Sequence, residues 1–217
     1  MKLNLTCKFD FSDLAQIEDE TFSLAKNGSS VLILIDMNKG FCVKGALASK
    51  RIAGIIPDVV KTVELFVNEK APIVAFTDRH TENAAEFSNL PAHCVEGTEE
   101  SELVDELSPY RSAMTVVGKN STNSFLEPNA QELIHDLIGS GFTNFVIAGC
   151  CTDICVKTFA IMLKTFFNQN DMDMNIIVPL EAVETYDTPG HDADVLNLFA
   201  LYDMRMNGIR LVSGIIA

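Results

Sequence analysis

Short apolar runs alternate with helical stretches along most of this chain, and this alternation limits the possible folds more than any other feature. Six runs rich in β-branched or aromatic residues predict strands, at 31–35, 72–77, 114–117, 144–148, 174–178 and 209–212. The segments between them predict helices over 53–69, 128–139, 152–167 and 189–206. Strands that alternate with helices form βαβ units, and continuously apolar strands are typical of a sheet buried on both faces. The predicted class is therefore α/β with a mostly parallel sheet.

The chain reads as one domain with an N-terminal addition. Its 217 residues fit one domain of roughly 100–200 residues plus an appendage, and no repeat or linker divides it. We expect residues 1–30 to form an N-terminal extension, with a helix around 12–25, and residues 31–217 to form the domain.

Charge and hydropathy restrict the possible partners and the compartment. The 16 basic and 30 acidic residues give a net charge of −14, which argues against nucleic acid or an anionic membrane surface as a partner. The apolar runs are far shorter than the ~20 residues of a membrane helix, and no apolar signal-peptide stretch is present near the N-terminus. The expected location is cytoplasmic, with no membrane partner.

Reactive side chains follow four of the predicted strands. Asp36, Asp78 and Lys119 come at or just beyond the ends of the first three, and the 151–155 turn with its thiols follows the fourth. Binding sites in open α/β sheets lie beyond the carboxyl ends of the strands. A single acid at a strand end is more often a turn former or a cap. Four chemically suitable groups at four successive strand ends instead predict an active site.

Among the six cysteines, Cys155 is the best candidate nucleophile. Because no signal peptide is found, we expect a reducing compartment without a disulfide scaffold. The simplest interpretation of these cysteines is then that they are small buried hydrophobic residues. Cys155, however, falls in the first turn of a helix that begins with the capping residues Thr152 and Asp153. Free backbone N–H groups and the positive end of the helix dipole stabilise a thiolate there. An adjacent Cys150–Cys151 redox pair is unlikely on geometric grounds, because neighbouring cysteines can join only through a strained ring.

A lysine and an aspartate complete a candidate catalytic group. Lys119 at the same sheet edge would favour the thiolate of Cys155, and Asp36 could accept and return a proton. These three residue types suit hydrolytic acyl transfer through a thioester. The backbone N–H groups of Cys151 and Cys155 are candidate donors for an oxyanion hole.

Two histidines and two carboxylates within one short stretch form a candidate metal site. Asp78 and His80 share a face of an extended segment, and Glu86 and His93 come from the irregular loop beyond. Such a nitrogen and oxygen donor set suits Zn²⁺, Fe²⁺ or Mn²⁺. Polar loop residues are the alternative interpretation, and Cys94 is a softer competing ligand. The two remaining histidines, His135 and His191, fall in predicted helices and are expected to be surface or capping residues.

At these residues the chain resembles the nicotinamidase branch of the isochorismatase-like cysteine hydrolases, over about residues 30–215. The segment Val31–Cys42 is similar to the family's first strand with its aspartate and following aromatic, and 118–125 is similar to its lysine motif. The segment 148–156, with Thr152-Asp-Ile-Cys155, is similar to its nucleophile motif. The family implies a three-layer doubly wound sandwich with a six-stranded, mostly parallel sheet of order 3-2-1-4-5-6. It also implies the triad Asp36, Lys119 and Cys155, and a cis peptide bond before Thr152.

The same resemblance implies a metal and a substrate pocket. Pro91-Ala-His93-Cys94-Val-Glu-Gly97-Thr98 matches a stretch that nicotinamidases carry and isochorismatases lack. It implies Asp78, His80, Glu86 and His93 as ligands of one divalent transition metal, zinc first, with iron or manganese as the other choices. The implied substrate contacts are Phe41, Leu90, Phe125 and Thr152. Many members have Trp at the position of Leu90, whereas this chain has no Trp.

The implied activity is metal-dependent hydrolysis of nicotinamide to nicotinic acid and ammonia through a cysteine thioester, in NAD salvage. Two alternatives stay open at this point. One is a related cysteine amidase that acts on another small amide or a ureide. The other is a catalytically decayed binding protein on the same fold. The family is commonly oligomeric, so the expected partners are a small-molecule amide and a second copy of the chain.

Overall fold

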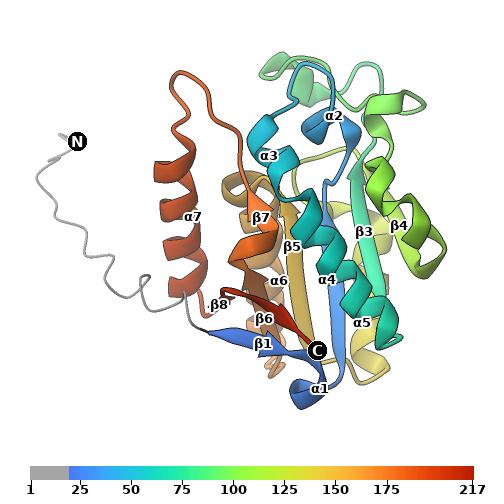
Figure 1. Ribbon diagram of the computed structural model, residues 1–217, viewed down its shortest axis with the longest axis vertical. Coiled ribbons are helices and arrows are strands. Elements are labelled where there is room, and N and C mark those ends of the chain that lie inside the picture. Colours follow the sequence, from blue (N-terminus) through green and yellow to red (C-terminus); the bar gives the residue numbers. More distant parts are fainter. Residues whose placement is uncertain (1–19) are drawn as a thin grey trace, which may run out of the picture.

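The computed structural model describes residues 20–217, which form a layered α/β structure (Figure 1). Its strands are β1 (Thr21–Ser23), β2 (Ser30–Ile35), β3 (Ile73–Asp78), β4 (Met114–Lys119), β5 (Asn144–Cys150), β6 (Asn175–Pro179), β7 (Val183–Glu184), β8 (Arg210–Val212) and β9 (Gly214–Ile216). Its α-helices are α1 (Leu24–Asn27), α2 (Lys39–Cys42), α3 (Lys50–Gly54), α4 (Ile56–Asn68), α5 (Pro128–Gly139), α6 (Lys157–Gln169) and α7 (Ala193–Met206). The other helical elements are the 3-10 helices η2 (Ala85–Ser88), η3 (Glu99–Ser101), η4 (Asp105–Ala113), η5 (Ser124–Leu126) and η7 (Leu180–Ala182), and the π-helical turn η6 (Thr152–Val156).

The main sheet confirms the predicted α/β class. Its strand order is β4-β3-β2-β5-β6-β8 and every pair is parallel, which is the predicted order 3-2-1-4-5-6 for the six predicted strands. The count of six was one too low, because β7 also pairs with β5. A separate two-stranded sheet joins β1 to β9. The two-residue β7 and the three-residue β1 and β9 were not predicted, whereas the equally short β8 was predicted, over 209–212.

Helices cover both faces of the sheet, and β2 shows how the sequence produces this arrangement. Successive side chains of a strand point to opposite faces. Leu32 and Leu34 pack in the cluster that contains α3 and α4, whereas Val31, Ile33 and Ile35 pack in the cluster that contains α5 and α6. Both sets are fully buried, and β2 is accordingly apolar from Val31 to Ile35. Helix α7 lies beside α6 at the β8 edge (Figure 1).

The predicted helices differ from the structure mainly at their ends. The predicted helix over 128–139 coincides with α5, which has Pro128 at its first turn. The predicted helix over 53–69 is two helices, α3 and α4, and Pro57 stands in the first turn of α4. The helix expected from 189 begins only at Ala193, because the Asp192 side chain accepts a hydrogen bond from the Val195 N–H and caps it there.

The structure tests only part of the prediction of an N-terminal helix around residues 12–25. Residues 1–19, which include Cys7 and most of the helix expected around 12–25, lie outside the described residues. The remainder of that expected helix is wrong, since Thr21–Ser23 is strand β1 and only Leu24–Asn27 is helical. Strand β1 forms by parallel pairing with β9, a partner from the other end of the chain that the local sequence of this segment does not indicate.

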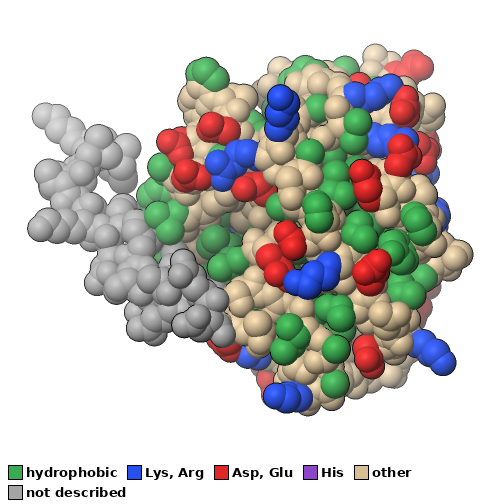
Figure 2. All heavy atoms as spheres, in the orientation of Figure 1, with side chains coloured by type: hydrophobic (Ala, Val, Ile, Leu, Met, Phe, Trp, Pro, Cys, Tyr) green, Lys and Arg blue, Asp and Glu red, His purple; other side chains and the backbone are tan. Residues whose placement is uncertain are grey.

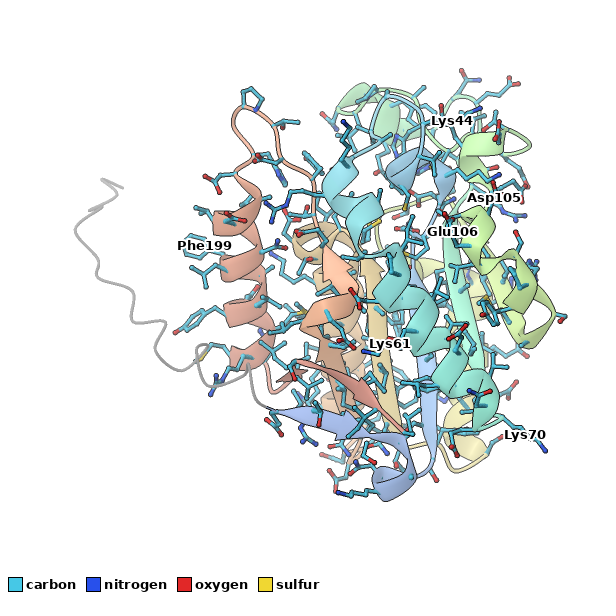
Figure 3. All side chains as sticks on the ribbon, viewed as in Figure 1. Lys44, Lys61, Lys70, Asp105, Glu106 and Phe199 are labelled. Atoms are coloured by element: carbon cyan, nitrogen blue, oxygen red, sulfur yellow. The ribbon has the colours of Figure 1, made fainter. Side chains whose placement is uncertain are left out.

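The outer surface mixes acidic and basic side chains over the face covered by α3 and α4 (Figure 2). Lys61 projects from α4 and Phe199 from the outer side of α7 (Figure 3). No helix within residues 20–217 combines the length and the apolar character required to cross a bilayer.

Candidate active site

The end of β2 places Asp36 beside the end of β5. Ile35 pairs with Gly149, and a Cβ atom at Gly149 would lie 2.0 Å from the Ile35 carbonyl oxygen, so only glycine fits there. Asp36 adopts a left-handed backbone with φ of 53° immediately after the strand and is fully buried. This close approach of the two strands brings the aspartate to the edge at which the cysteine turn begins.

Lys119, at the end of β4, connects two buried carboxylates. Its Nζ lies 2.8 Å from Asp36 Oδ2 and also donates a hydrogen bond to Asp78 Oδ1. Asp78 ends β3, and the register pairs Asp78 with Lys119 directly. All three side chains are almost completely buried. Burial alone would lower the pKa of Lys119, but the two carboxylates outweigh it and hold the pKa well above its usual range.

The two carboxylates titrate in opposite directions. Burial, together with the nearby charge of Asp78, raises the pKa of Asp36 to about 7, although Lys119 and the Cys155 side chain act against this rise. Burial also acts to raise the pKa of Asp78. There, however, Lys119 and the histidines His80 and His93 outweigh burial, and its pKa is well below its ordinary value. Asp36 is therefore suited to proton transfer, and Asp78 remains an anion.

Cys155 lies on η6, a π-helical turn between β5 and α6, and is buried. The sequence predicts that the helix start and Lys119 favour its thiolate, and Lys119 does act in that direction, but burial opposes it. Burial raises the pKa of Cys155 well above its usual range, and the charges of Asp36 and Asp78 raise it further. Lys119 lowers it only in part, because the same ammonium already pairs with two carboxylates. The resting group is a neutral thiol, which needs a proton acceptor.

The cis peptide bond lies one residue earlier than expected. It joins Cys150 to Cys151, not Cys151 to Thr152. Strand β5 runs to Cys150, so the turn starts at that residue, and Cys151 is extended and directly precedes η6. Cys151 and Cys155 both line the pocket described below.

Three of the four expected metal ligands come together. One ligand atom each from Asp78, His80 and His93 lies within 4.8 Å of the others, and all three residues are buried. Asp78 Oδ2 lies 3.3 Å from His80 Nε2 and 3.6 Å from His93 Nε2. A buried carboxylate with two imidazole nitrogens is a donor set that zinc, iron and manganese accept.

The hydrogen bonds of both histidines leave Nε2 facing the centre of this group. His80 Nδ1 lies 3.2 Å from Asn120 Oδ1, and that oxygen also accepts from the Thr81 N–H, so Nδ1 carries the ring proton. His93 Nδ1 likewise donates to the Pro91 carbonyl oxygen at 2.8 Å. Such outer contacts fix the tautomer of a metal-binding histidine. Buried His80 Nε2 makes no aligned hydrogen bond with any described residue, which fits a site for a cation.

Glu86, the fourth expected ligand, is not part of this group. It belongs to η2, is half-buried, and its Oε1 accepts a hydrogen bond from Thr122 Oγ1 at 3.1 Å. Its charge still helps to raise the pKa of His80, so it faces the same space. Cys94 is also outside the group, although it is buried.

One pocket is lined both by Cys155 and by the metal candidates Asp78 and His93. Of the expected substrate contacts, Phe41 and Leu90 line it, and the Phe41 ring lies 5.5 Å from the His93 ring. Two others do not line it. Phe125 is buried in the core, with ring contacts to Phe159 and Phe166, and Thr152 is fully buried under the turn. Both belong to motifs of the site but face the protein interior.

Several residues of the site carried no signal in the sequence. Asn38 holds the end of β3, because its Nδ2 donates to the Asp78 and Ser101 carbonyl oxygens and its Oδ1 accepts from the Asp78 N–H. Asn120 orients His80, as described above. Further pocket residues are Leu47, Thr122, Ile154 and Tyr186. The positions of Asn38 and Asn120, directly beyond strand ends, were the only available hint.

Comparison with known proteins places the chain in a family. The model of the isochorismatase domain matches residues 30–205, so the chain belongs to the isochorismatase family, a hydrolase family. Nicotinamidase 1 of Arabidopsis thaliana is 27% identical over 223 residues, which cover 91% of each chain. The parallel sheet and the clustered Asp, Lys and Cys side chains agree with this assignment.

Solved structures of related enzymes share the fold. The nicotinamidase of Bacillus subtilis is 25% identical with a TM-score of 0.71, over 85% of this chain and 99% of that one. A pyrazinamidase of Pyrococcus horikoshii in complex with zinc is 26% identical with a TM-score of 0.69, again over 85% and 99%. An N-carbamoylsarcosine amidase of Thermoplasma acidophilum, at 24% identity and a TM-score of 0.70 over 85% and 96%, shares the fold.

Proposed function

We propose that this chain is a metal-dependent nicotinamidase, which hydrolyses nicotinamide to nicotinic acid and ammonia and thereby serves NAD salvage. One observation carries the proposal: a buried nucleophile site and a buried group of Asp78, His80 and His93 open on the same pocket and share Lys119 through its two carboxylate partners. The relatives named as nicotinamidases support the same choice.

The reaction begins with proton transfer from Cys155 to Asp36. The Cys155 thiol is neutral at rest, and the raised pKa of Asp36 makes this carboxylate a suitable acceptor near neutral pH. The Cys155 Sγ attacks the amide carbon, and the backbone N–H groups of Cys151 and Cys155 stabilise the oxyanion. Asp36 returns the proton to the leaving ammonia, which leaves a thioester. Asp36 then takes a proton from the water that attacks the thioester carbon. The C–S bond breaks, Asp36 returns that proton to Cys155 Sγ, and nicotinic acid is released.

Lys119 and the donor group organise this chemistry. Lys119 holds Asp36 in place and balances its charge when the carboxylate is ionised. Asp78, His80 and His93 would hold the metal, with Glu86 at a greater distance on the pocket wall. When bound, a divalent ion would supply a Lewis-acid anchor for the ring nitrogen of a pyridine amide.

The charge of the pocket favours a neutral amide. Within the described part of the chain, the residues that line the pocket include the acids Asp78 and Glu86 but no lysine or arginine. Lys119 is committed to two carboxylates. A substrate with its own carboxylate, such as a carbamoyl amino acid, would meet the acids Asp78 and Glu86 and find no lysine or arginine partner among the lining residues. Nicotinamide is uncharged, and its ring suits the apolar wall of Phe41, Leu47 and Leu90.

Ammonia release from a panel of amides tests the proposal. The purified chain is loaded with Zn²⁺, Fe²⁺ or Mn²⁺ and given nicotinamide, N-carbamoylsarcosine or a ureide. We expect turnover of nicotinamide in preference to the others, and loss of that turnover in Cys155→Ala but not in the matched variant Cys42→Ala. Preference for the carbamoyl substrate would replace nicotinamidase with the related amidase. Inactivity with every amide and metal would favour a binding protein with a decayed site.

A further inference from the structure

Tyr186 lines the pocket, and neither the motifs nor the mechanism above account for it. It follows β7 in the connection to α7 and shares the pocket lining with Cys151, Ile154 and Cys155. Its side chain is only half-buried. An aromatic side chain at the mouth of an apolar pocket contributes a large contact area to any flat ligand.

His191 holds Tyr186 in two ways. The two rings are stacked, with centroids 3.8 Å apart and an interplanar angle of 15°. His191 Nδ1 also lies 3.0 Å from the Tyr186 carbonyl oxygen, so both the side chain and the backbone of Tyr186 contact this imidazole. His191 itself is fixed by a short loop, because its backbone N–H and carbonyl pair with those of Thr188.

The other nitrogen of His191 contacts the nucleophile turn. Nε2 lies 3.0 Å from Asp153 Oδ2, and both side chains are largely buried, with exposed fractions of 16% and 10%. Asp153 stands two residues before Cys155 on η6. The imidazole thus connects the loop that carries Tyr186 to the turn that carries the nucleophile. His191 is not the surface or capping histidine that the sequence suggested.

We propose that Tyr186 is a specificity-determining wall of the amide pocket, and that His191 and Asp153 are positioning residues that hold its ring beside the Cys155 turn. The inference deepens the proposed function and rests on it for the choice of nicotinamide as the probe. In this arrangement the loop between β7 and α7 selects flat aromatic amides, while the triad performs the chemistry.

Steady-state kinetics with nicotinamide separate a wall from a general structural role. We expect Tyr186→Ala to raise KM about five- to tenfold, as the loss of one aromatic contact would, and to leave kcat within about twofold. Tyr186→Phe keeps the ring and should behave like the wild type. His191→Ala should raise KM in the same direction. The matched control is His135→Ala, whose ring on α5 contacts Phe166 away from the pocket, and it should change neither constant.

A double-variant cycle tests whether His191 acts through Tyr186. If it does, adding His191→Ala to Tyr186→Ala raises KM no further, whereas independent effects would multiply. Multiplication, or a fall in kcat with unchanged KM, would overturn the positioning role. An unchanged KM in Tyr186→Ala would overturn the wall itself.

A probe that needs no turnover separates failure of this inference from failure of the proposed function. Alkylation of Cys155 by iodoacetamide and by its N-phenyl derivative is followed by mass spectrometry of the Cys155 peptide. We expect Tyr186→Ala to change the ratio of the two rates by severalfold and Tyr186→Phe to leave it unchanged. If nicotinamide is not hydrolysed but this ratio shifts, the role of Tyr186 as a pocket wall is supported and the assignment of nicotinamide as the substrate is wrong. An unchanged ratio in Tyr186→Ala would remove the wall, whatever the substrate.

Discussion

Lys119 Nζ lies 2.8 Å from Asp36 Oδ2, and the same ammonium donates a hydrogen bond to Asp78. One buried cation therefore neutralises a carboxylate of the nucleophile site and a carboxylate of the candidate metal site. Without it, two anions would remain in the interior, where an unpaired charge is expensive. This relationship makes the stability of the chain and its chemistry depend on the same residue.

Removal of this ammonium should destabilise the fold. We expect Lys119→Met to lower the free energy of unfolding by about 3–5 kcal/mol, because it leaves buried charges unpaired. Urea denaturation measures the change. The matched control is Lys61→Met on α4, where the lysine is 55% exposed and 3.4 Å from Glu181 Oε2; the change there should stay within about 1 kcal/mol. Equal effects of the two substitutions would contradict the buried bridge. A second variant, Lys119→Met with Asp36→Asn, should recover part of the loss.

Activity should fall on the acid side of neutrality. Asp36 must be ionised to take the proton of Cys155, and its pKa is raised to about 7. Below that value the carboxylate is protonated, so kcat/KM should drop about tenfold for each pH unit. A cation bound at Asp78 would offset one of the two causes of the raised pKa, so in the metal-loaded enzyme the acid limb should lie below about pH 7. A pH–rate profile of nicotinamide hydrolysis checks this, and a profile that stays flat across this range would exclude Asp36 as the proton acceptor.

Metal affinity should depend on the two histidines and on the residue that orients one of them. We expect His80→Ala to abolish stoichiometric Zn²⁺ binding in calorimetry. Asn120→Ala should weaken binding about 10–100-fold, since it removes the oxygen that fixes the His80 ring. Glu86→Gln should weaken it less than His80→Ala, because Glu86 lies outside the group of close donors. Loss of binding as complete in Glu86→Gln as in His80→Ala would make Glu86 a ligand after all.

Of the expected substrate contacts, we expect Phe125 to contribute to stability and Leu90 to substrate binding. Phe125 contacts Phe159 and Phe166 in the core, so Phe125→Leu should lower stability by about 1 kcal/mol and leave KM for nicotinamide unchanged. Leu90 lines the pocket and is 36% exposed, so Leu90→Ala should raise KM with little effect on stability. Thermal unfolding and steady-state kinetics of both variants provide the comparison. The reverse pattern would indicate that Phe125 contacts the substrate and that Leu90 does not.

The α/β class and the strand-end residues could be predicted because local patterns specify them, whereas the strand order came from the family resemblance. Continuous apolar runs identified β2 and β5, and the polar residue at or just beyond the end of an apolar run marked Asp36 and Lys119. Parallel strands bring their carboxyl ends to one edge, so residues far apart in sequence could be grouped without coordinates. The paired strands β1 and β9 were missed, although the equally short β8 was predicted from residues 209–212.

By itself, the sequence determined the α/β class and the identity of the reactive side chains, because buried strands and helix starts have local signatures. The strand order was available only through the family resemblance. Tertiary structure decided the charge state of each group and the side that each one faces. Whether Cys155 rests as a thiol depends on burial and on carboxylates from β2 and β3, and these are properties of the packed molecule. Likewise, the contact of His191 with Tyr186 and Asp153 joins a loop to a distant turn, and no spacing in the sequence encodes it.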